Sequence, residues 1–388
     1  MRNIYYWSPF TSKVATIKSV INSAYAIKRY SSKKYCSYIL NAVGEWDDYL
    51  KEINEKKINV INLNKNTIFK DLDKEGFLRS RIAYLYIFFK CIFSLNLILK
   101  NKKPDFLIIH LITSLPLFLF IFQNFKTKLI LRISGLPKMN FFRKMLWKLA
   151  IKKIYKISCP TLDTYKDLSK INFLKEKLIV LNDPIINVSE IKKIFKTKFN
   201  ATNESAKKVI KNREFFLSIG RFTKQKNFIF YLKCIPKILR FNKNLLFVFI
   251  GTGDEDKLFF DTAKNLNILD NLIIIKNTDN VHYFMKKTKC FVLTSLWEDP
   301  GFVLVEAGYN NCQVISSDCP NGPKEIIGND GGYLFRSNNE KNFLETFYKF
   351  LNDTKENKLQ KKINLKKRVK NYTIFEHARS LKKILEVI

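Results

Sequence analysis

Residues 291–327, FVLTSLWEDPGFVLVEAGYNNCQVISSDCPNGPKEII, predict two strand–helix units in succession and constrain the fold more than any other stretch. Residues 291–295 form a short apolar run typical of a buried parallel strand. A helix is expected over residues 302–308, because a Pro-Gly pair precedes it and a glycine ends it. A second strand over residues 313–317 and a short helix ending at Ile327 follow. Alternating strands and helices of this kind build an α/β domain around a parallel sheet.

Two glutamates and a helix start in this stretch have the spacing of a ligand site. Glu298 follows the first predicted strand, and Glu306 lies about one turn into the helix, roughly 6 to 8 Å further along its axis. The free N–H groups of Gly301, Phe302 and Val303 at the helix start could bind an anion. A nucleotide sugar would fit such a site, because its anionic group lies between two sugars whose hydroxyl groups the carboxylates could hold. The competing interpretation is that both glutamates are solvated surface charges.

A second candidate segment lies upstream at residues 215–227, FFLSIGRFTKQKN. A strand is expected over residues 215–219, after which Gly220 permits a tight turn. Arg221 then follows the strand end, and Lys226 comes at the start of the next helix. Two cations at this place are natural counter-ions of a diphosphate, although a solvated lysine face would contain the same residues.

These two segments, in this order and with the run GGYLF that follows them, resemble the retaining glycosyltransferases of family 4, which have the GT-B fold. The likeness is good over residues 213–336 and thin before residue 190. It implies a UDP- or GDP-linked sugar as donor and a glycan or lipid-linked oligosaccharide as acceptor, in O-antigen, capsule or lipopolysaccharide synthesis. It also implies that Glu306 holds the ribose hydroxyls and Glu298 the donor sugar, with no cofactor and no metal.

The apolar runs of the whole chain predict two doubly wound Rossmann-like domains, because strand-length and helix-length segments alternate in both halves. We expect a first domain over residues 1–186, a lysine-rich linker over 187–212 and a second domain over 213–372. The resemblance adds that the domains face a central cleft and that the last helix, about 373–388, crosses back to the first domain. The expected strands are residues 4–7, 36–43, 58–63, 106–109, 129–133, 154–158 and 178–181, then 215–219, 245–250, 272–276, 291–295 and 313–317.

The first domain offers fewer candidate residues. His110 ends the apolar run DFLIIHL and is a catalytic candidate, with a buried structural histidine as the alternative. Many family members have a histidine after the next strand that contacts the donor sugar, but the matching segment here, LRISGLPK, has Arg132 and Ser134. Either His110 or that pair makes the contact, or the contact is absent. Thr11 and Ser12 lie in the first loop, where a helix cap is the simplest interpretation.

Two acidic pairs resemble the DxD of metal-dependent glycosyltransferases. Asp71 and Asp73 lie among lysines, and Asp254 and Asp256 have the pattern of a helical first turn. We therefore expect neither pair to hold a metal ion. His282, in NVHYFMKK, is expected on a surface helix.

The net charge of +35, from 69 Lys and Arg against 34 Asp and Glu, restricts the partners to nucleic acid, an anionic membrane or acidic small substrates. No long run of consecutive basic residues occurs, so a specific nucleic-acid partner is not expected and an anionic membrane surface is favoured. The seven cysteines form no CxxC pair, and the first residues do not have the pattern of a signal peptide. We therefore expect a cytoplasmic protein that is peripheral on the inner face of the membrane.

Two long apolar stretches could enter a membrane. Residues 106–123 contain His110 and Pro116, so a buried strand, a turn and a buried helix are expected there rather than a span. Residues 82–99 predict a helix with Lys90 inside it, either in the core or lying on a bilayer, with the core favoured.

In sugar transfer, the bond between the anomeric carbon and the diphosphate breaks, which leaves negative charge on the phosphate oxygens. Arg221, Lys226 and the helix-start N–H groups are the residues expected to stabilise that charge, and no protein nucleophile is evident. Two alternatives stay open. Nucleotide-sugar 2-epimerases share the two-lobed architecture, and the charge alone would suit a basic protein that binds membranes or nucleic acid.

Overall fold

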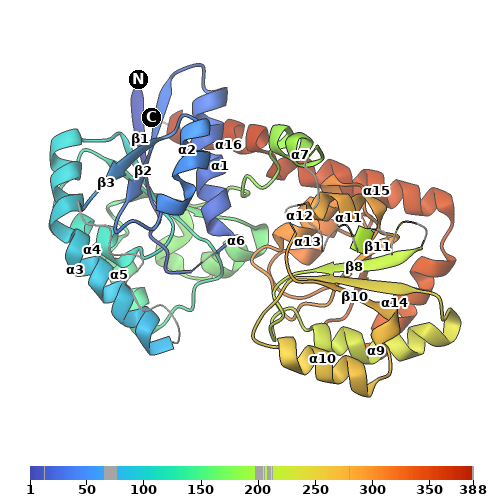
Figure 1. The fold of residues 1–388 in the computed structure, drawn as a ribbon. Coiled ribbons are helices and arrows are strands. Elements are labelled where there is room, and N and C mark those ends of the chain that lie inside the picture. The colour runs from blue at the N-terminus through green and yellow to red at the C-terminus, as the bar shows by residue number, and fades with distance from the viewer. Residues whose placement is uncertain are drawn as a thin grey trace. The chain divides into compact units, whose positions relative to one another are not determined.

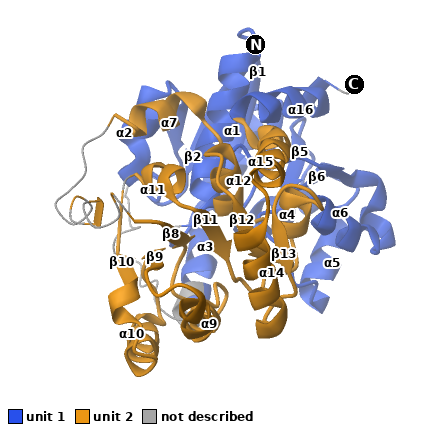
Figure 2. Ribbon diagram, turned by 90° about the vertical axis from the view of Figure 1, so that its right-hand side faces the viewer, with its two compact units in different colours: residues 1–185, 374–388 blue, residues 186–373 orange. Residues whose placement is uncertain are grey.

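The computed structural model describes residues 1–12, 14–64, 77–196, 213–278 and 280–386, together with residues 204, 206, 207 and 211. The chain divides into two compact units, residues 1–185 with 374–388, and residues 186–373 (Figure 2). Each unit contains one parallel sheet with helices packed on it (Figure 1). The predicted α/β fold with two Rossmann-like domains is confirmed.

The sheet of the first unit consists of β1 (Arg2–Trp7), β2 (Tyr35–Asn41), β3 (Asn59–Asn62), β4 (Phe106–Ile109), β5 (Lys128–Arg132), β6 (Ile154–Cys159) and β7 (Leu178–Val180). Its strand order is β3-β2-β1-β4-β5-β6-β7. The central strand β4 and residues 4–7 of β1 are apolar and buried on both faces, as in parallel sheets covered by helices. The order reverses between β1 and β4, and open α/β sheets bind ligands beyond the carboxyl ends of strands at such a point.

The helices of the first unit are α1 (Thr16–Tyr30), α2 (Leu50–Glu55), α3 (Phe77–Lys102), α4 (Ser114–Phe122), α5 (Phe141–Ala150), α6 (Leu162–Ser169) and α16 (Ile374–Glu386), with short 3-10 turns at Asp47–Tyr49 and Asn172–Lys177. The helices α3, α4 and α5 pack on the sheet face that buries Trp7, whereas α1, α2 and α16 pack on the face that buries Tyr6. The end of the chain is thus part of the first unit, where the Arg2 guanidinium donates to the Leu385 carbonyl at 3.2 Å.

The sheet of the second unit consists of β8 (Phe215–Ile219), β9 (Leu246–Ile250), β10 (Leu272–Ile275), β11 (Cys290–Leu293), β12 (Val314–Ser317) and β13 (Tyr333–Phe335), in the order β10-β9-β8-β11-β12-β13. Its order reverses between β8 and β11. A core rich in phenylalanine lies against one face, where Phe216, Phe249 and Phe343 are buried. The helices are α7 (Val188–Ile194), α9 (Phe228–Phe241), α10 (Asp256–Asn265), α11 (Val281–Lys287), α12 (Phe302–Tyr309), α13 (Pro323–Ile327), α14 (Glu340–Asn352) and α15 (Lys355–Val369), with 3-10 turns at Leu269–Asn271 and Lys370–Tyr372.

Several local predictions are wrong. Helix α1 begins at Thr16 after Ala15, and no side chain that the structure describes caps it, so Thr11 and Ser12 are not its cap. His282 lies on a helix, but it is only 2% exposed, and its Nδ1 atom lies 2.8 Å from the Asn310 amide nitrogen inside the second unit. Two helix predictions are confirmed, because α4 is the buried helix expected after residue 106 and α3 contains the helix expected over residues 82–99. The favoured position of the latter in the core is wrong for one side of α3, which is exposed.

Two other expectations involve residues outside the described ranges. The segment 187–212 was expected to be a linker, but α7 lies within it and belongs to the second unit; residues 197–203, 205, 208–210 and 212 are outside the described residues. Asp71 and Asp73 are also outside them.

A buried hydrogen-bond chain joins α16 to the sheet of the first unit. The Nδ1 atom of His377 lies 2.8 Å from the Asn182 carbonyl oxygen, which can only accept, so we infer that Nδ1 carries the proton. The Nε2 atom therefore accepts from the Ser23 hydroxyl at 2.8 Å, and the Tyr6 hydroxyl donates to Ser23 Oγ at 3.1 Å. Burial, assisted by the positive charge of Arg132, lowers the pKa of His377 to about 3.

Because His377 is buried in its neutral form, we expect the protein to lose stability in mild acid. The folded state keeps the pKa of His377 near 3, while an unfolded histidine has a pKa of about 6.5, so the unfolded state binds an extra proton between these values. Lowering the pH from 7 to 5 should therefore cost about 2 kcal/mol of unfolding free energy through this residue. Urea unfolding at both pH values should show that His377→Gln loses about 2 kcal/mol less than the wild type over the same interval. An equal loss in both proteins would show that His377 is already charged in the folded state.

Candidate functional site

The carboxyl ends of β8, β11 and β12 bring most of the predicted site residues together in the second unit. These strands are neighbours in the sheet, so the loops that follow them meet at one edge. Gly220 and Arg221 follow β8, Glu298 and Gly301 lie in the loop after β11, and the loop after β12 leads into α13. The edge lies beside the β8–β11 reversal, where α/β sheets bind ligands.

Backbone contacts fix these loops. A Cβ atom on Gly251, after β9, would lie 2.0 Å from the Gly220 carbonyl oxygen. A Cβ atom on Gly322, where φ is +130°, would lie 2.0 Å from the carbonyl oxygen of Pro300. Only glycine permits such approaches, so the loops after β8 and β9 lie directly against each other, as do the loops after β11 and β12. The sequence did not predict Gly251 or Gly322 as site residues. The Asn-Gly-Pro turn at residues 321–323 was the signal that could have indicated Gly322.

Lys226 and Glu298 form an ion pair at the centre of this edge. The Lys226 Nζ atom lies 2.5 Å from Glu298 Oε1, and the Ser295 hydroxyl donates to the same oxygen at 2.6 Å. The Glu298 N–H donates to the Pro320 carbonyl at 3.1 Å. The side chains of Lys226 and Glu298 are 16% and 5% exposed. The sequence suggested separate roles for the two residues, whereas the structure joins them into one buried charged group.

The start of α12 lies directly after this pair. Gly301 is the residue before the first turn, and no side chain among the described residues caps the helix. The N–H groups of Phe302 and Val303, both partly exposed, therefore begin the helix without a side-chain acceptor. Glu306 is partly exposed one turn further along α12. The positive end of the helix dipole and these N–H groups can receive an anion.

Arg221 is exposed at the end of β8 and makes no ion pair within the described part of the chain. The Thr223 hydroxyl donates to the Arg221 backbone carbonyl at 3.5 Å. This contact does not use the guanidinium group. A guanidinium in this state can bind an incoming phosphate through paired N–H groups.

His110 belongs to the first unit and follows β4 at the point where the strand order reverses. It is 5% exposed, and its Nε2 atom has no hydrogen-bond partner among the described residues. Burial, with a smaller contribution from the positive charge of Arg132, holds the pKa of His110 well below its usual value. The ring is therefore neutral at physiological pH and can donate or accept a hydrogen bond, but it is not a source of positive charge.

The alternative to His110, the pair Arg132 and Ser134, is not arranged as a free ligand group. Arg132 is 2% exposed and forms an ion pair with Asp183, and it also donates to the Leu181 carbonyl at 3.1 Å. The Ser19 hydroxyl donates to the same Asp183 oxygen at 2.6 Å. Arg132 is thus part of the buried framework of the first unit.

No group of three or more metal-ligating side chains occurs within the ranges that the structure describes. Of the second acidic pair, Asp256 begins α10 and accepts from the Gly253 N–H at 2.8 Å. This is the geometry of a carboxylate at a helix start.

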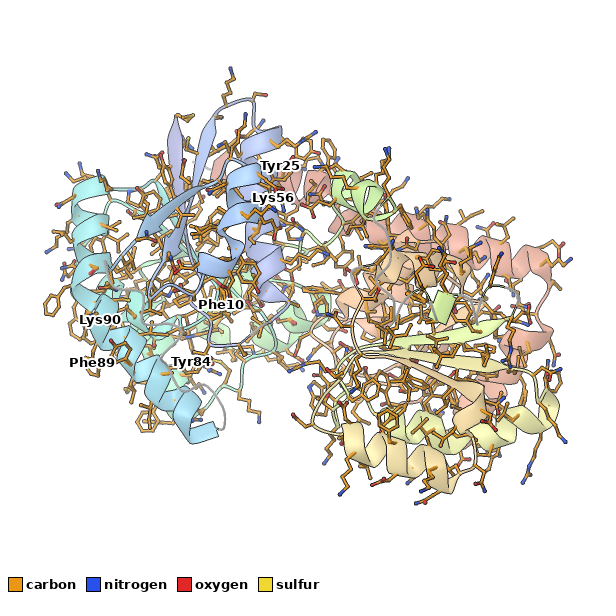
Figure 3. The ribbon with its side chains drawn as sticks, viewed as in Figure 1. Phe10, Tyr25, Lys56, Tyr84, Phe89 and Lys90 are labelled. Carbon is orange, nitrogen blue, oxygen red and sulfur yellow. The ribbon has the colours of Figure 1, made fainter. Side chains whose placement is uncertain are left out.

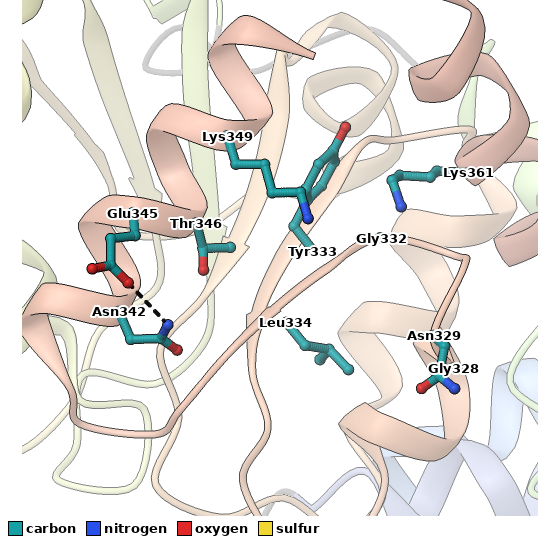
Figure 4. A pocket seen from close by; sticks show the side chains of 10 residues that line it. All are labelled: Gly328, Asn329, Gly332, Tyr333, Leu334, Asn342, Glu345, Thr346, Lys349 and Lys361. Carbon is teal, nitrogen blue, oxygen red and sulfur yellow. Dashed lines mark hydrogen bonds between the residues drawn. The ribbon is translucent and has the colours of Figure 1, made fainter. Parts of the chain in front are cut away.

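A separate cavity of about 460 Å³ lies between β13, α14 and α15 (Figure 4). Tyr333 lines it at the amino end of its strand, with Lys349 and Lys361 nearby, and Asn342 donates to Glu345 at 3.4 Å across its rim. Because ligand sites in parallel sheets lie at carboxyl ends of strands, we do not assign the sugar donor to this cavity.

Comparison with known proteins agrees with this geometry. A family model described as glycosyl transferases group 1 matches residues 200–370, which include the whole strand-end site of the second unit. An uncharacterised glycosyltransferase from Methanocaldococcus jannaschii is 28% identical over 242 residues, and the match covers 59% of this chain and 59% of that protein. A Campylobacter jejuni enzyme that adds N-acetyl-D-galactosamine to an undecaprenyl-diphosphate-linked glycan is 28% identical over 292 residues, 74% of this chain and 76% of that protein.

A solved structure extends the agreement to the complete chain. Anabaena HepE in complex with UDP matches with a TM-score of 0.73 at 11% identity, over 100% of both chains. The GT-B fold is thereby confirmed. The family match and the names of the relatives support an enzyme of the glycosyltransferase class.

The buried ion pair predicts a strong energetic coupling. Lys226→Met leaves the Glu298 carboxylate buried without its cation and should lower the unfolding free energy by about 3 to 5 kcal/mol. The double variant Lys226→Met with Glu298→Gln removes both charges and should be more stable than the lysine variant alone. Urea unfolding of the wild type, both single variants and the double variant completes the cycle. Additive losses would show that the two side chains do not interact in solution.

Proposed function

We propose that the protein is a retaining glycosyltransferase that transfers a sugar from a UDP- or GDP-linked donor to a glycan or lipid-linked acceptor in surface polysaccharide synthesis. The observation that carries the proposal is the edge of the second unit where the Lys226–Glu298 pair meets the uncapped start of α12. That edge lies within the segment matched by the glycosyltransferase family model.

The proposed donor position follows from charge. The diphosphate binds the N–H groups at Phe302 and Val303, with the Arg221 guanidinium and the Lys226 ammonium as counter-ions. Glu306, one turn into α12, holds the ribose hydroxyls, and Glu298 accepts from hydroxyls of the transferred sugar. UDP bound to a protein of the same fold supports a nucleotide as ligand.

The pairing of Lys226 with Glu298 gives this site its chemistry. Before the donor binds, each charge satisfies the other, so neither is buried alone. When the anomeric bond breaks, negative charge grows on the phosphate oxygens, and Lys226 is already held at a fixed position to meet it. Each such preorganised group contributes about 2 to 4 kcal/mol to lowering the barrier, so the proposed mechanism requires no metal ion.

The proposal includes a role for the first unit. Its neutral His110, with a buried Nε2 atom that lacks a partner in the described structure, forms a hydrogen bond to a sugar hydroxyl. We assign no protein nucleophile. A lipid-linked acceptor is favoured by the undecaprenyl-linked substrate of the Campylobacter relative and by the net charge of +35, which suits a protein bound to the cytoplasmic side of the inner membrane.

Replacing Glu306 tests the donor site. We expect Glu306→Ala to abolish sugar transfer and to lose the thermal stabilisation that the best UDP- or GDP-sugar gives the wild type, about 2.7 kcal/mol at 100 times its dissociation constant. The matched control is Glu356→Ala on the exposed side of α15, which should keep both properties. Wild-type turnover in Glu306→Ala would reject the site. Conversion of the free nucleotide sugar without transfer to an acceptor would instead indicate the epimerase.

Replacing Arg221 tests the leaving-group role. Arg221→Ala removes one stabilising cation and should lower kcat/KM by about 30- to 1,000-fold. Because Arg221 is exposed, the unfolding free energy should change by less than about 0.5 kcal/mol. Steady-state kinetics together with urea unfolding separate the two effects, and unchanged kinetics would remove Arg221 from the mechanism.

A further inference from the structure

Helix α3 is apolar on two opposite sides. Its buried side places Ile87, Cys91 and Leu95 against the sheet of the first unit at intervals of four residues. A second series, offset by two residues, contains Phe89 and Phe93. Two residues correspond to about 200° around a helix, so this second series faces away from the sheet.

The outward side of α3 is strongly exposed. Phe93 is 81% exposed and Phe89 is 68% exposed, and Ile82, Leu85 and Leu97 are each about 60% exposed. Figure 3 shows Phe89 and Lys90 on the outer side of the helix. Among the described residues, Arg81–Lys102 is the one helical segment long and apolar enough to cross a membrane, yet only 28% of its most apolar window is buried. A core helix with this composition would be mostly buried.

The neighbouring helix α4 continues the apolar surface. The ring of Phe88 lies 5.6 Å from the ring of Phe118 on α4, and Phe118 lies 4.7 Å from Phe122. Phe122 is 69% exposed. Because α3 and α4 pack on the same face of the sheet, their outer sides point in the same general direction.

Helix α5 adds a third row on the same face of the sheet. Its residues Phe141 and Phe142 are about three-quarters exposed, and Met145 and Leu149 are about half exposed. We call the outer sides of α3, α4 and α5 the apolar platform. Soluble monomers rarely expose contiguous apolar surface of this extent unless a partner covers it.

The charge of the platform identifies the partner. Helices α3, α4 and α5 contain no aspartate or glutamate, whereas exposed lysines and arginines such as Lys90, Arg143, Lys144 and Lys148 lie between the apolar residues. A second copy of the chain would bring two positive surfaces together, which is unfavourable. An anionic bilayer offers hydrocarbon for the apolar side chains and phosphates for the basic ones.

We propose that the platform binds an anionic membrane surface and that α3 lies in the bilayer interface without crossing it. Helix α3 cannot span while its other side, from Ile87 to Leu99, packs on the sheet. Membrane binding by the platform deepens the proposed function. It rests on that function in one respect, because a lipid-linked acceptor would place the reaction at the bilayer. Membrane binding itself involves no sugar transfer.

Vesicle co-sedimentation of the full chain tests the platform, with phosphatidylglycerol–phosphatidylcholine vesicles and with phosphatidylcholine alone. The wild type should bind the anionic vesicles at least about tenfold more tightly. Phe89→Ser with Phe93→Ser should reduce that binding at least about tenfold, because two aromatic side chains no longer enter the bilayer. The matched control on exposed positions of α10, Leu258→Ser with Phe260→Ser, should bind like the wild type.

A charge-reversed pair tests the electrostatic part. Lys144→Glu with Lys148→Glu should bring binding to anionic vesicles close to the level on phosphatidylcholine, while Lys257→Glu with Lys264→Glu on α10 should have a much smaller effect. Unchanged thermal unfolding would show that all variants are folded. Equal sedimentation of the wild type and both platform variants would overturn the proposal. So would a concentration-dependent dimer that dissociates in the Phe89 and Phe93 variant without vesicle binding. Glu306→Ala should bind vesicles normally, so a failed transferase assignment is recognised separately.

Discussion

The candidate site depends on close contacts between backbone segments at the carboxyl edge of the second sheet. The Gly220 carbonyl oxygen occupies the space that a Cβ atom on Gly251 would need. The Pro300 carbonyl oxygen likewise occupies the space that a Cβ atom on Gly322 would need. These contacts hold the loop after β8 against the loop after β9, and the loop after β11 against the loop after β12. The Leu296 N–H donates to the Gln225 carbonyl at 2.8 Å and so joins the loops after β8 and β11. As a result Lys226 reaches Glu298, and the start of α12 lies beside both, although the two residues are 72 positions apart in sequence.

The two units supply different kinds of polar group. The second unit offers full charges, with Arg221 exposed and Lys226 held by a carboxylate. In the first unit, the polar groups near the carboxyl ends of the central strands are neutral or paired: Arg132 is neutralised by Asp183, and both His110 and His377 are buried and uncharged. Full charges suit a diphosphate on which negative charge develops, whereas neutral hydrogen-bonding groups suit sugar hydroxyls.

The sequence predicted the sheets well, because buried parallel strands are short, apolar and separated by clear helix and turn signals. Strands such as β4 and β8 have the predicted bounds. Helix α15 was missed because it is highly charged; its buried contacts, Leu365 and Val369, pack where Gly308 of α12 leaves room. The buried state of His282 and Arg132 also escaped prediction, since it depends on Asn310 and Asp183, partners distant in sequence. At the site, the positions of the charged residues were predictable because they follow predicted strand ends. The contact between Lys226 and Glu298 was not predictable, because it depends on how two loops distant in sequence meet in the folded structure.

The position of α16 has a consequence for how the chain matures on the ribosome. The first unit contains residues 1–185, yet its core also needs Leu381 and Leu385, and its Tyr6–Ser23 chain ends on His377. The second unit is continuous in sequence and can therefore complete its core first, although its residues are synthesised later. Until α16 emerges, α1 leaves an uncovered apolar surface, so the nascent first half is the stage of biogenesis most in need of chaperone protection.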